Sequence, residues 1–325
     1  METEILKPKE GIKKAAKIIK EGGIVAFPTE TVYGLGASAL NSDAVAKIFE
    51  AKGRPKDNPL IVHLSKPKDA EKIAREIPGE FYKLAKKFMP GPLTIVLKKA
   101  EAVPDIVTAG GDTVAVRVPK NKTARRLIKL SGPIAAPSAN RSKHVSPTAA
   151  IHVYEDLKGE IPLIIDGGAS KVGIESTVLD LTSEFPTILR PGAVTAQMIA
   201  KVIGFAKEHS GEIKVAKSPG MKYTHYAPSC PAVIGGSFDE CVAEFLKSKA
   251  EGKKPVVICR TGNKMNGIDI IELGRTEKKI ASSVYGALRL AEKNFNYIII
   301  ENLGKTGVLG AVMNRLYKAA GGREV

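Results

Sequence analysis

The sequence contains no tryptophan, and aromatic residues make up only 5% of its 325 residues. Its three cysteines, Cys230, Cys241 and Cys259, are odd in number and lack a Cys-x-x-Cys spacing. A disulfide framework and a zinc ribbon both require paired cysteines, so this pattern excludes them. The scarcity of aromatic side chains argues against a protein built to read RNA, because single-stranded bases are usually held by stacking on aromatic rings.

Long apolar runs are also missing. No segment approaches the roughly 18 apolar residues that cross a membrane, and runs such as Ile298–Ile300 have the length of strands. The first residues, Met1–Lys7, have no apolar core of the kind that a signal peptide requires. We therefore expect a cytoplasmic protein with no membrane partner.

Acidic residues are few relative to basic ones, 34 against 50, which gives a formal net charge of +16. Both the N-terminal and the C-terminal parts carry an excess of Lys and Arg, so the charge is not that of a single basic tail. A positive field favours anionic ligands such as nucleotides or RNA, although a Lys-rich surface alone has the same composition. Because 43% of the residues are hydrophobic, the chain is globular.

The length favours two domains. A boundary is expected near Lys217–Pro231, which has three prolines and no helix or strand periodicity. We predict a first domain over residues 1–208, a linker over 209–230 and a second domain over 231–325. Within the linker, Tyr223, His225 and Tyr226 are costly to leave in solvent, so this segment is expected to pack against protein. We expect it to act as a lid over the site of the first domain. The alternative is that its side chains only hold the two domains together.

In the first domain, strand-like runs alternate with amphipathic helices, which predicts an α/β domain with a mostly buried sheet. One helix is expected over residues 11–20, one over 43–52 behind the capping residues Asn41 and Ser42, and one starting at Ser146-Pro147. The predicted strands are Ile24–Phe27, Leu60–Leu64, Leu93–Leu97, Val114–Val118, Ile134–Ala136, Leu163–Ile165, Val178–Leu181 and Thr187–Leu189.

The second domain shows a β-α-β rhythm, which predicts a smaller, three-layer, Rossmann-like domain. Its expected strands are Ala232–Ile234, Val256–Cys259, Ile268–Glu272 and Tyr297–Glu301. Its expected helices are Phe238–Lys249, Glu277–Asn294 and Val308–Ala319.

Two apparent nucleotide motifs fail on inspection. Gly304-Lys305-Thr306 looks like the end of a P-loop, but the first glycine of that motif would fall on Ile299. Gly34–Ala39 fits a relaxed GxGxxA fingerprint, yet the polar insert Pro28–Thr31 separates it from the preceding strand. A nicotinamide site is therefore disfavoured.

Polar segments follow several of the predicted strands and helices. Hydroxyls, an acid and two glycines fill Phe27–Gly36, directly after a buried strand, where open α/β sheets bind ligands. Three cations lie within Lys52–Leu60, a loop suited to phosphate, and Ala136–Ser142 offers hydroxyl and amide groups. Arg117 lies inside a predicted strand. Its side chain is therefore expected either on the solvent-exposed face of the sheet or in the interior, paired with an anion. Each segment, taken alone, is also compatible with an ordinary turn.

Taken together and in this order, these segments resemble the YrdC family, whose larger members are the threonylcarbamoyl-adenylate synthases. The family's KxR and SxN motifs are present as Lys52-x-Arg54 and Ser138-x-Asn140, and its PTETVYGL segment as Pro28–Leu35. Further matches are Asp166-Gly167-Gly168 through Glu175-Ser176-Thr177, Arg190–Ala193, and the PGMKYTHYAP-like linker of the two-domain branch.

The resemblance implies a YrdC-like twisted open sheet with flanking helices, followed by the smaller second domain. It also implies a reaction in which L-threonine, bicarbonate and ATP give threonylcarbamoyl-AMP and pyrophosphate, with Mg²⁺ accompanying ATP. The product would pass to a transfer RNA threonylcarbamoyltransferase complex, which modifies the adenosine next to the anticodon. Such chemistry needs cations around phosphoryl oxygens and the alignment of two anions.

The same resemblance assigns residues to roles, with Lys52 and Arg54 as the catalytic pair. It places Lys52, Arg54, Asn58, Thr113, Asn140, Ser146, Arg190 and Tyr226 at ATP, and Thr31, His63, Arg117, Ser138 and Ser176 at L-threonine. Arg117 is the expected partner of the threonine carboxylate. Neither a general base nor a direct metal ligand is assigned.

Two alternatives remain open. A basic chain with a concave site could bind RNA through its phosphates, and we expect such binding to be at most weak and non-specific. The second alternative is a carbamoyltransferase like the larger hydrogenase-maturation relatives. The zinc-type cysteine pairs of those proteins are missing here.

Overall fold

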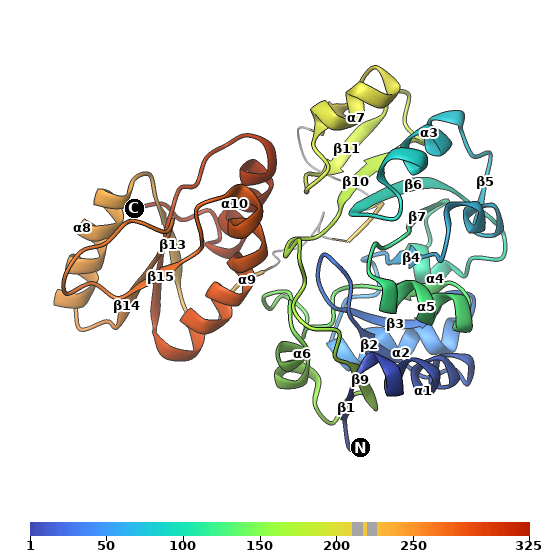
Figure 1. The fold of residues 1–325 in the computed structure, drawn as a ribbon, viewed down its shortest axis with the longest axis horizontal. Coiled ribbons are helices and arrows are strands. Elements are labelled where there is room, and N and C mark those ends of the chain that lie inside the picture. Colours follow the sequence, from blue (N-terminus) through green and yellow to red (C-terminus); the bar gives the residue numbers. More distant parts are fainter. Residues whose placement is uncertain (210–216, 220–225) are drawn as a thin grey trace. The chain divides into compact units, whose positions relative to one another are not determined.

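The structure is a computed structural model that describes residues 1–209, 217–219 and 226–325. The chain forms two compact units, drawn together in Figure 1. The first unit comprises Met1–Ser142, Pro147–Lys171 and Glu175–Lys222. The second comprises Lys143–Ser146, Val172–Ile174 and Tyr223–Val325, and thus takes two short segments from the N-terminal part of the chain.

The described strands of the first unit form a twelve-stranded mixed sheet. Their order is β1-β9-β2-β3-β8-β4-β7-β6-β10-β11-β12, and β5 pairs with β6. The strands are β1 (Glu4–Leu6), β2 (Val25–Phe27), β3 (Gly34–Ser38), β4 (Ile61–His63), β5 (Ala74–Arg75), β6 (Leu93–Lys99), β7 (Thr113–Arg117), β8 (Ile134–Ala136), β9 (Leu163–Ile165), β10 (Thr177–Asp180), β11 (Thr187–Arg190) and β12 (Lys207–Glu208).

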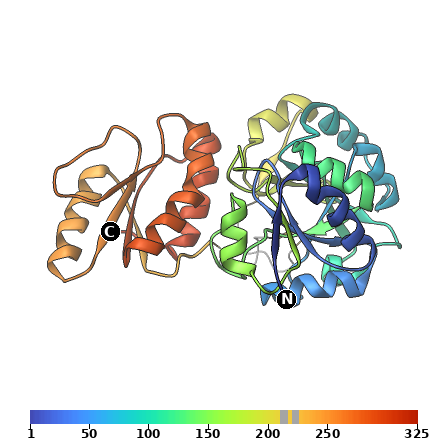
Figure 2. The same cartoon turned by 60° about the horizontal axis from the view of Figure 1, so that its bottom comes forward.

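Helices flank this sheet on both faces (Figures 1 and 2). They are α1 (Pro8–Lys20), α2 (Ser42–Lys52), α3 (Gly79–Phe88), α4 (Asp105–Thr108), α5 (Lys122–Ser131), α6 (Ala150–Leu157) and α7 (Ala196–Ile203), with the short 3₁₀ helix η1 (Pro67–Lys72). The predicted twisted, open α/β sheet with flanking helices is confirmed.

Successive side chains of a strand point to opposite faces of the sheet, which divides the apolar core into two layers. On β2, Val25 and Phe27 belong to a cluster that contains α1 and α5, whereas Ala26 between them belongs to a larger cluster on the opposite face. That larger cluster includes Ile48 of α2 and Leu84 of α3. Helices therefore cover both faces of the sheet at β2.

The face that carries α1 and α5 changes character beyond β8. Over β4, β7, β6 and β10 its apolar residues reduce to a small cluster of Ile61, Val96, Ala115 and Val178. The neighbouring positions on this face are polar. The fold thus leaves part of one sheet face to polar side chains.

The second unit has a four-stranded parallel sheet in the order β13-β16-β14-β15. Its strands are β13 (Ala232–Gly235), β14 (Pro255–Cys259), β15 (Ile270–Glu272) and β16 (Tyr297–Glu301), and its helices are α8 (Phe238–Ala250), α9 (Glu277–Asn294) and α10 (Gly307–Ala319). Helix α8 lies on one side of this sheet and α9 and α10 on the other (Figure 1). The predicted Rossmann-like α/β domain is confirmed.

One local prediction was wrong. The helix expected to start at Ser146-Pro147 begins at Ala150, because the Pro147 carbonyl accepts the N–H of Tyr33 at 2.8 Å and belongs to the neighbouring segment. Gly34 and Gly36, at the end of the polar segment Phe27–Gly36, lie in β3. A Cβ on Gly36 would come within 2.7 Å of the Phe27 ring, so this glycine permits close packing of β2 and β3.

Among the residues that the structure describes, no helix has the length and apolar character needed to cross a membrane.

Candidate active site

The candidate site lies on the polar part of the sheet face described above. His63 of β4 is in register with Arg117 of β7, and Arg117 is in register with Thr94 of β6. The Thr94 hydroxyl lies 2.7 Å from the hydroxyl of Ser176, just before β10. Because these strands are adjacent, the four side chains form a continuous row across the sheet, which we call the polar row. All four are buried.

The loop after β2 holds Arg117 of the polar row in a fixed orientation. The Arg117 guanidinium donates to the Thr31 hydroxyl at 2.8 Å and to the Glu30 carboxylate at 2.7 Å. The other Glu30 oxygen accepts the backbone N–H groups of Lys120 at 2.9 Å and Asn121 at 3.3 Å, directly before α5. Only 4% of the Arg117 side chain and 8% of the Glu30 side chain are exposed. Glu30 therefore ties β7, the β2 loop and the start of α5 together.

Burial and this pairing set the protonation states around the polar row. Burial alone raises the pKa of Glu30, but the charge and hydrogen bond of Arg117 and the Lys120 N–H outweigh it, so the pKa lies below its ordinary value. Burial, helped by the positive charge of Arg117, lowers the pKa of His63 to about 3. Near neutral pH the pair is charged and the imidazole is neutral. Nδ1 of His63 lies 3.1 Å from the Ile61 carbonyl, which can only accept, so Nε2 is left as an acceptor.

Arg190, at the end of β11, lies beside Ser176. Its guanidinium donates to the Ser176 carbonyl at 2.9 and 3.1 Å and to the Ser176 hydroxyl at 3.3 Å. It also donates to the carbonyl of Pro219 at 3.0 Å, and Lys217 Nζ lies 2.8 Å from the Asp180 carboxylate. The described linker residues 217–219 therefore lie on the first unit, in contact with Arg190.

The two short motifs on which the sequence prediction rests are joined by one side chain. Lys52, the last residue of α2, donates from Nζ to the Ser138 carbonyl at 2.7 Å and to the Asn140 carbonyl. Burial, and then the charge of Arg54, lower the pKa of Lys52 well below its ordinary value. Ser138 in turn donates its hydroxyl to the Asn140 side chain at 2.5 Å. Lys52 thus braces the segment after β8 against the end of α2.

The loop after α2 is closed by Arg54, whose guanidinium donates to the carbonyls of Asn58 at 3.1 Å and Pro59 at 3.2 Å. Gly53 before it adopts φ +58°, a left-handed conformation that ends the helix and favours glycine. Within the described part of the chain, the buried Oδ1 of Asn58 has no hydrogen-bond partner. A buried acceptor of this kind can receive a donor from a ligand.

The structure therefore brings seven of the thirteen predicted site residues into three hydrogen-bonded groups. The first contains Thr31 and Arg117, the second Ser176 and Arg190, and the third Lys52, Ser138 and Asn140. Thr113 belongs to the same unit and shares its strand face with Arg117.

Ser146 and Tyr226 fall in the second unit, where the Tyr226 ring stacks on Tyr285 of α9 with the centroids 5.5 Å apart. Tyr223 and His225 lie outside the described residues. The assignment of individual residues to ATP or L-threonine stays a prediction.

The sequence analysis missed two residues of this site. Glu30 lies in the polar segment that had been singled out, but nothing in the sequence pairs it with Arg117, 87 residues away. Thr94 lies in the otherwise apolar run Leu93–Leu97. It could have been recognised in the sequence as a hydroxyl side chain at a position that alternates with core residues. No group of three His, Cys, Asp or Glu residues that could hold a metal ion occurs in the described ranges.

Comparison with known proteins assigns the chain to a family. Residues 17–192 match the Sua5/YciO/YrdC family model, described as "Telomere recombination". Residues 194–321 match the model described as "Threonylcarbamoyl-AMP synthase, C-terminal domain".

Similar proteins are found in bacteria and archaea. The threonylcarbamoyl-AMP synthase of Pyrococcus abyssi is 48% identical, covering 96% of this chain and 94% of its own. That of Bacillus subtilis is 46% identical, covering 97% and 94%. The crystal structure of P. abyssi Sua5 complexed with L-threonine superimposes with a TM-score of 0.93 at 47% identity, over 100% of this chain and 98% of the other. The chain belongs to the Sua5/YciO/YrdC family and, within it, to the two-domain threonylcarbamoyl-AMP synthases.

Proposed function

We propose that this enzyme makes L-threonylcarbamoyl-AMP and pyrophosphate from L-threonine, bicarbonate and ATP. The observation that supports the proposal most directly is the buried polar row, in a chain 47% identical to a protein crystallised with L-threonine. In the cytoplasm, the product would supply a threonylcarbamoyltransferase complex that modifies transfer RNA next to the anticodon.

The proposed chemistry has two steps. The threonine amine attacks the carbon of bicarbonate, and loss of water gives a carbamate. A carbamate oxygen then attacks the α-phosphorus of ATP, the bond to the bridging oxygen breaks, and pyrophosphate leaves. Both reactants of the second step are anions, so the protein must hold them together against their repulsion.

The geometry offers complementary groups for each reactant. The threonine carboxylate would bind Arg117, whose guanidinium is already oriented by Glu30 and Thr31. His63, Ser138 and Ser176 would complete the threonine site. The ATP phosphates would meet the cations of the Lys52–Arg54 loop and Arg190, with Asn58, Thr113 and Asn140 as the remaining nucleotide contacts in the first unit.

Magnesium enters the proposal together with ATP. In proteins Mg²⁺ is commonly held by substrate phosphates and waters, with few protein ligands. The Glu30 carboxylate of this site is occupied by Arg117 and two backbone N–H groups, which fits an ion carried by the phosphates. When bound, Mg²⁺ would neutralise charge on the departing pyrophosphate.

The first prediction concerns the reaction itself. Pure protein with ATP, Mg²⁺ and labelled bicarbonate should release pyrophosphate and form a labelled adenylate only when L-threonine is present, and without transfer RNA. Chromatography of the nucleotides and a pyrophosphate assay measure both products. Equal pyrophosphate release without threonine, or no labelled adenylate, would show that the proposed function is wrong.

The second prediction concerns the Lys52–Arg54 loop. We expect Lys52→Ala and Arg54→Ala each to lower kcat more than tenfold, because removal of a positioned group near a reacting phosphoryl typically costs a few kcal/mol, about a hundredfold. Lys56→Ala removes the same charge from an exposed position of this loop and should change kcat less than threefold. Circular dichroism checks that the variants fold. Normal kinetics in both site variants would make this loop an ordinary turn.

The third prediction concerns Glu30. Glu30→Gln keeps the size of the side chain but removes the charge that orients Arg117, so KM for L-threonine should rise at least tenfold while KM for ATP changes less than threefold. Breaking a buried ion pair also lowers stability, here by about 3 kcal/mol at pH 7. Glu50→Gln, at an exposed position of α2, is the control.

The pH dependence of this variant separates pairing from packing. The folded-state pKa of Glu30 is lowered, so its stabilisation is present above pH 4.5 and is lost as the pH falls towards the folded-state value. The stability difference between wild type and Glu30→Gln should therefore shrink on acidification below pH 4.5. A difference that stays constant with pH would contradict the ion-pair explanation.

The fourth prediction concerns the linker, for which we propose a role as a lid over the site. The contacts of Lys217 with Asp180 and of Pro219 with Arg190 support it, since Arg190 is a proposed ATP ligand. The Tyr226–Tyr285 stack lies within the second unit and does not distinguish a lid from a segment that only joins the domains. A chain cut after residue 208 should remain folded but lose adenylate formation or release the adenylate to hydrolysis.

In the full chain, ATP should protect the linker from protease if it closes over the nucleotide. Limited proteolysis with and without ATP, followed by mass spectrometry, measures this protection. Full activity of the truncated chain, together with no effect of ATP on cleavage, would leave only the joining role.

A further inference from the structure

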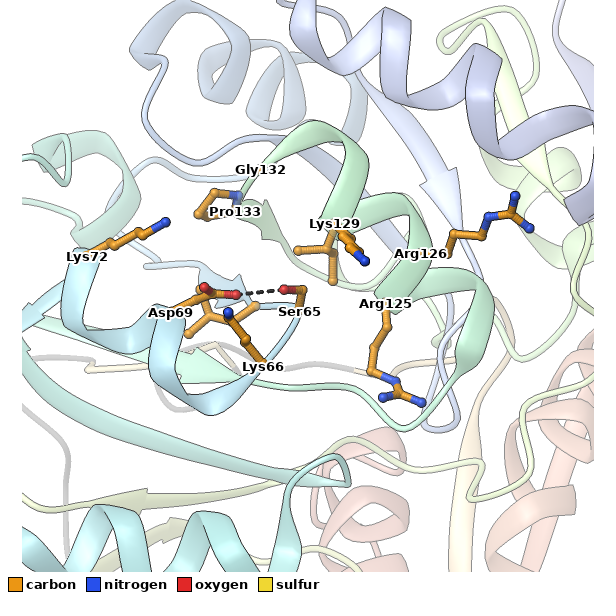
Figure 3. Close-up of a pocket in the computed structure, with 11 residues that line it drawn as sticks. Ser65, Lys66, Asp69, Lys72, Arg125, Arg126, Lys129, Gly132 and Pro133 are labelled. Atoms are coloured by element: carbon orange, nitrogen blue, oxygen red, sulfur yellow. Dashed lines mark hydrogen bonds between the residues drawn. The ribbon is translucent and has the colours of Figure 1, made fainter.

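The first unit has a hollow outside the proposed substrate site. It lies between η1 and α5, has a volume of about 560 Å³ and is shown in Figure 3. None of its lining residues is assigned to ATP or L-threonine. We call it the basic pocket, and its lining is Leu64, Ser65, Lys66, Asp69, Lys72, Arg125, Arg126, Ile128, Lys129, Gly132 and Pro133.

Positive charge is concentrated in this pocket well beyond the average of the chain. Five of its eleven lining residues are Lys or Arg, whereas the whole sequence has 50 among 325. The one acid in the lining, Asp69, accepts the hydroxyl of Ser65 at 2.6 Å. Lys66, Ser65 and Asp69 lie across the hollow from Lys129, and Arg126 points away from it (Figure 3).

These cations lack the acidic partners that some cations have elsewhere in the unit. Arg75 and Lys98, for example, both pair with Glu76. Over residues 1–209, 217–219 and 226–325, none of the five cations of the basic pocket forms an ion pair. The Nε of Arg125 is buried and has no hydrogen-bond partner in the same ranges.

The fold holds these charges together at some cost. Ala124, Leu127 and Ile128 of α5 are buried against the sheet, which fixes the outer face of the helix. Arg125 and Lys129 are four residues apart on that helix, and like charges at this spacing repel by a few tenths of a kcal/mol. An anion bound between α5 and η1 would relieve this repulsion and pair the cations.

We infer that the basic pocket binds a short phosphate chain, a di- or triphosphate anion. Such an anion carries several negative charges and many acceptor oxygens in a small volume. It could therefore contact cations of the η1 segment and of α5 at the same time. The volume lies within the range of roughly 300–1,000 Å³ that is common for small-ligand sites, and a concave pocket suits a compact anion better than a duplex backbone.

The test uses inorganic tripolyphosphate as the probe and calorimetric titration of the full chain. Because tripolyphosphate would also bind the proposed ATP site, every protein carries Arg54→Ala. Lys66→Gln combined with Lys129→Gln should raise the Kd at least tenfold. The matched control, Lys68→Gln with Lys122→Gln, removes two exposed charges from η1 and α5 outside the pocket and should raise the Kd less than threefold.

Three results would overturn the inference. Equal weakening in the control would mean that only the general positive field acts on the probe. No binding of tripolyphosphate in the Arg54→Ala background would mean that the pocket takes no such anion. Binding of an RNA oligomer that depends on Lys66 and Lys129, with no binding of tripolyphosphate, would make the surface a nucleic-acid contact instead. Since none of the variants in the pocket touches the proposed substrate site, failure here leaves the synthase proposal intact.

Discussion

The buried ion pair between Glu30 and Arg117 is the interaction on which the arrangement of the site depends. It joins the loop after β2 to strand β7 and to the start of α5, which lie 87 to 91 residues further along the chain. A buried arginine without a partner is costly, and a carboxylate that also accepts two backbone N–H groups fixes its place as well as its charge. The guanidinium is therefore oriented before any ligand arrives, which lowers the cost of binding one.

The sheet makes room for this pair by the way its helices are distributed. Helices α1 and α5 bury Val25 and Phe27 of β2, but the same face over β4, β7, β6 and β10 carries a small apolar cluster and the polar row. The opposite face, with Ile48 and Leu84, has the apolar packing that keeps those strands in register. The apolar face thus stabilises these strands, and the opposite face carries the polar side chains of the candidate site.

The sequence predicted elements best where packing alone determines them. The bounds of β8, β9, β16 and α9 agree with the prediction, because short apolar runs and a long amphipathic repeat encode them locally. Contacts between distant segments were not predictable in the same way. The pairing of Glu30 with Arg117 depends on strand order, and the helix expected at Ser146 was displaced by a backbone hydrogen bond of Pro147 to Tyr33.

Motif resemblance named Lys52 as a phosphate ligand, but it could not show how that lysine is held. Its Nζ donates to the carbonyls of Ser138 and Asn140, and Arg190 donates to the carbonyls of Ser176 and Pro219. A carbonyl carries a dipole and no net charge, so these bonds fix a cation without cancelling its charge, whereas Glu30 does cancel that of Arg117. In the proposed reaction, a phosphate of ATP would meet a lysine held by carbonyls, whereas the threonine carboxylate would meet an arginine already oriented by Glu30. Because burial and Arg54 lower the pKa of Lys52, an arriving phosphate would favour its charged form and strengthen the contact.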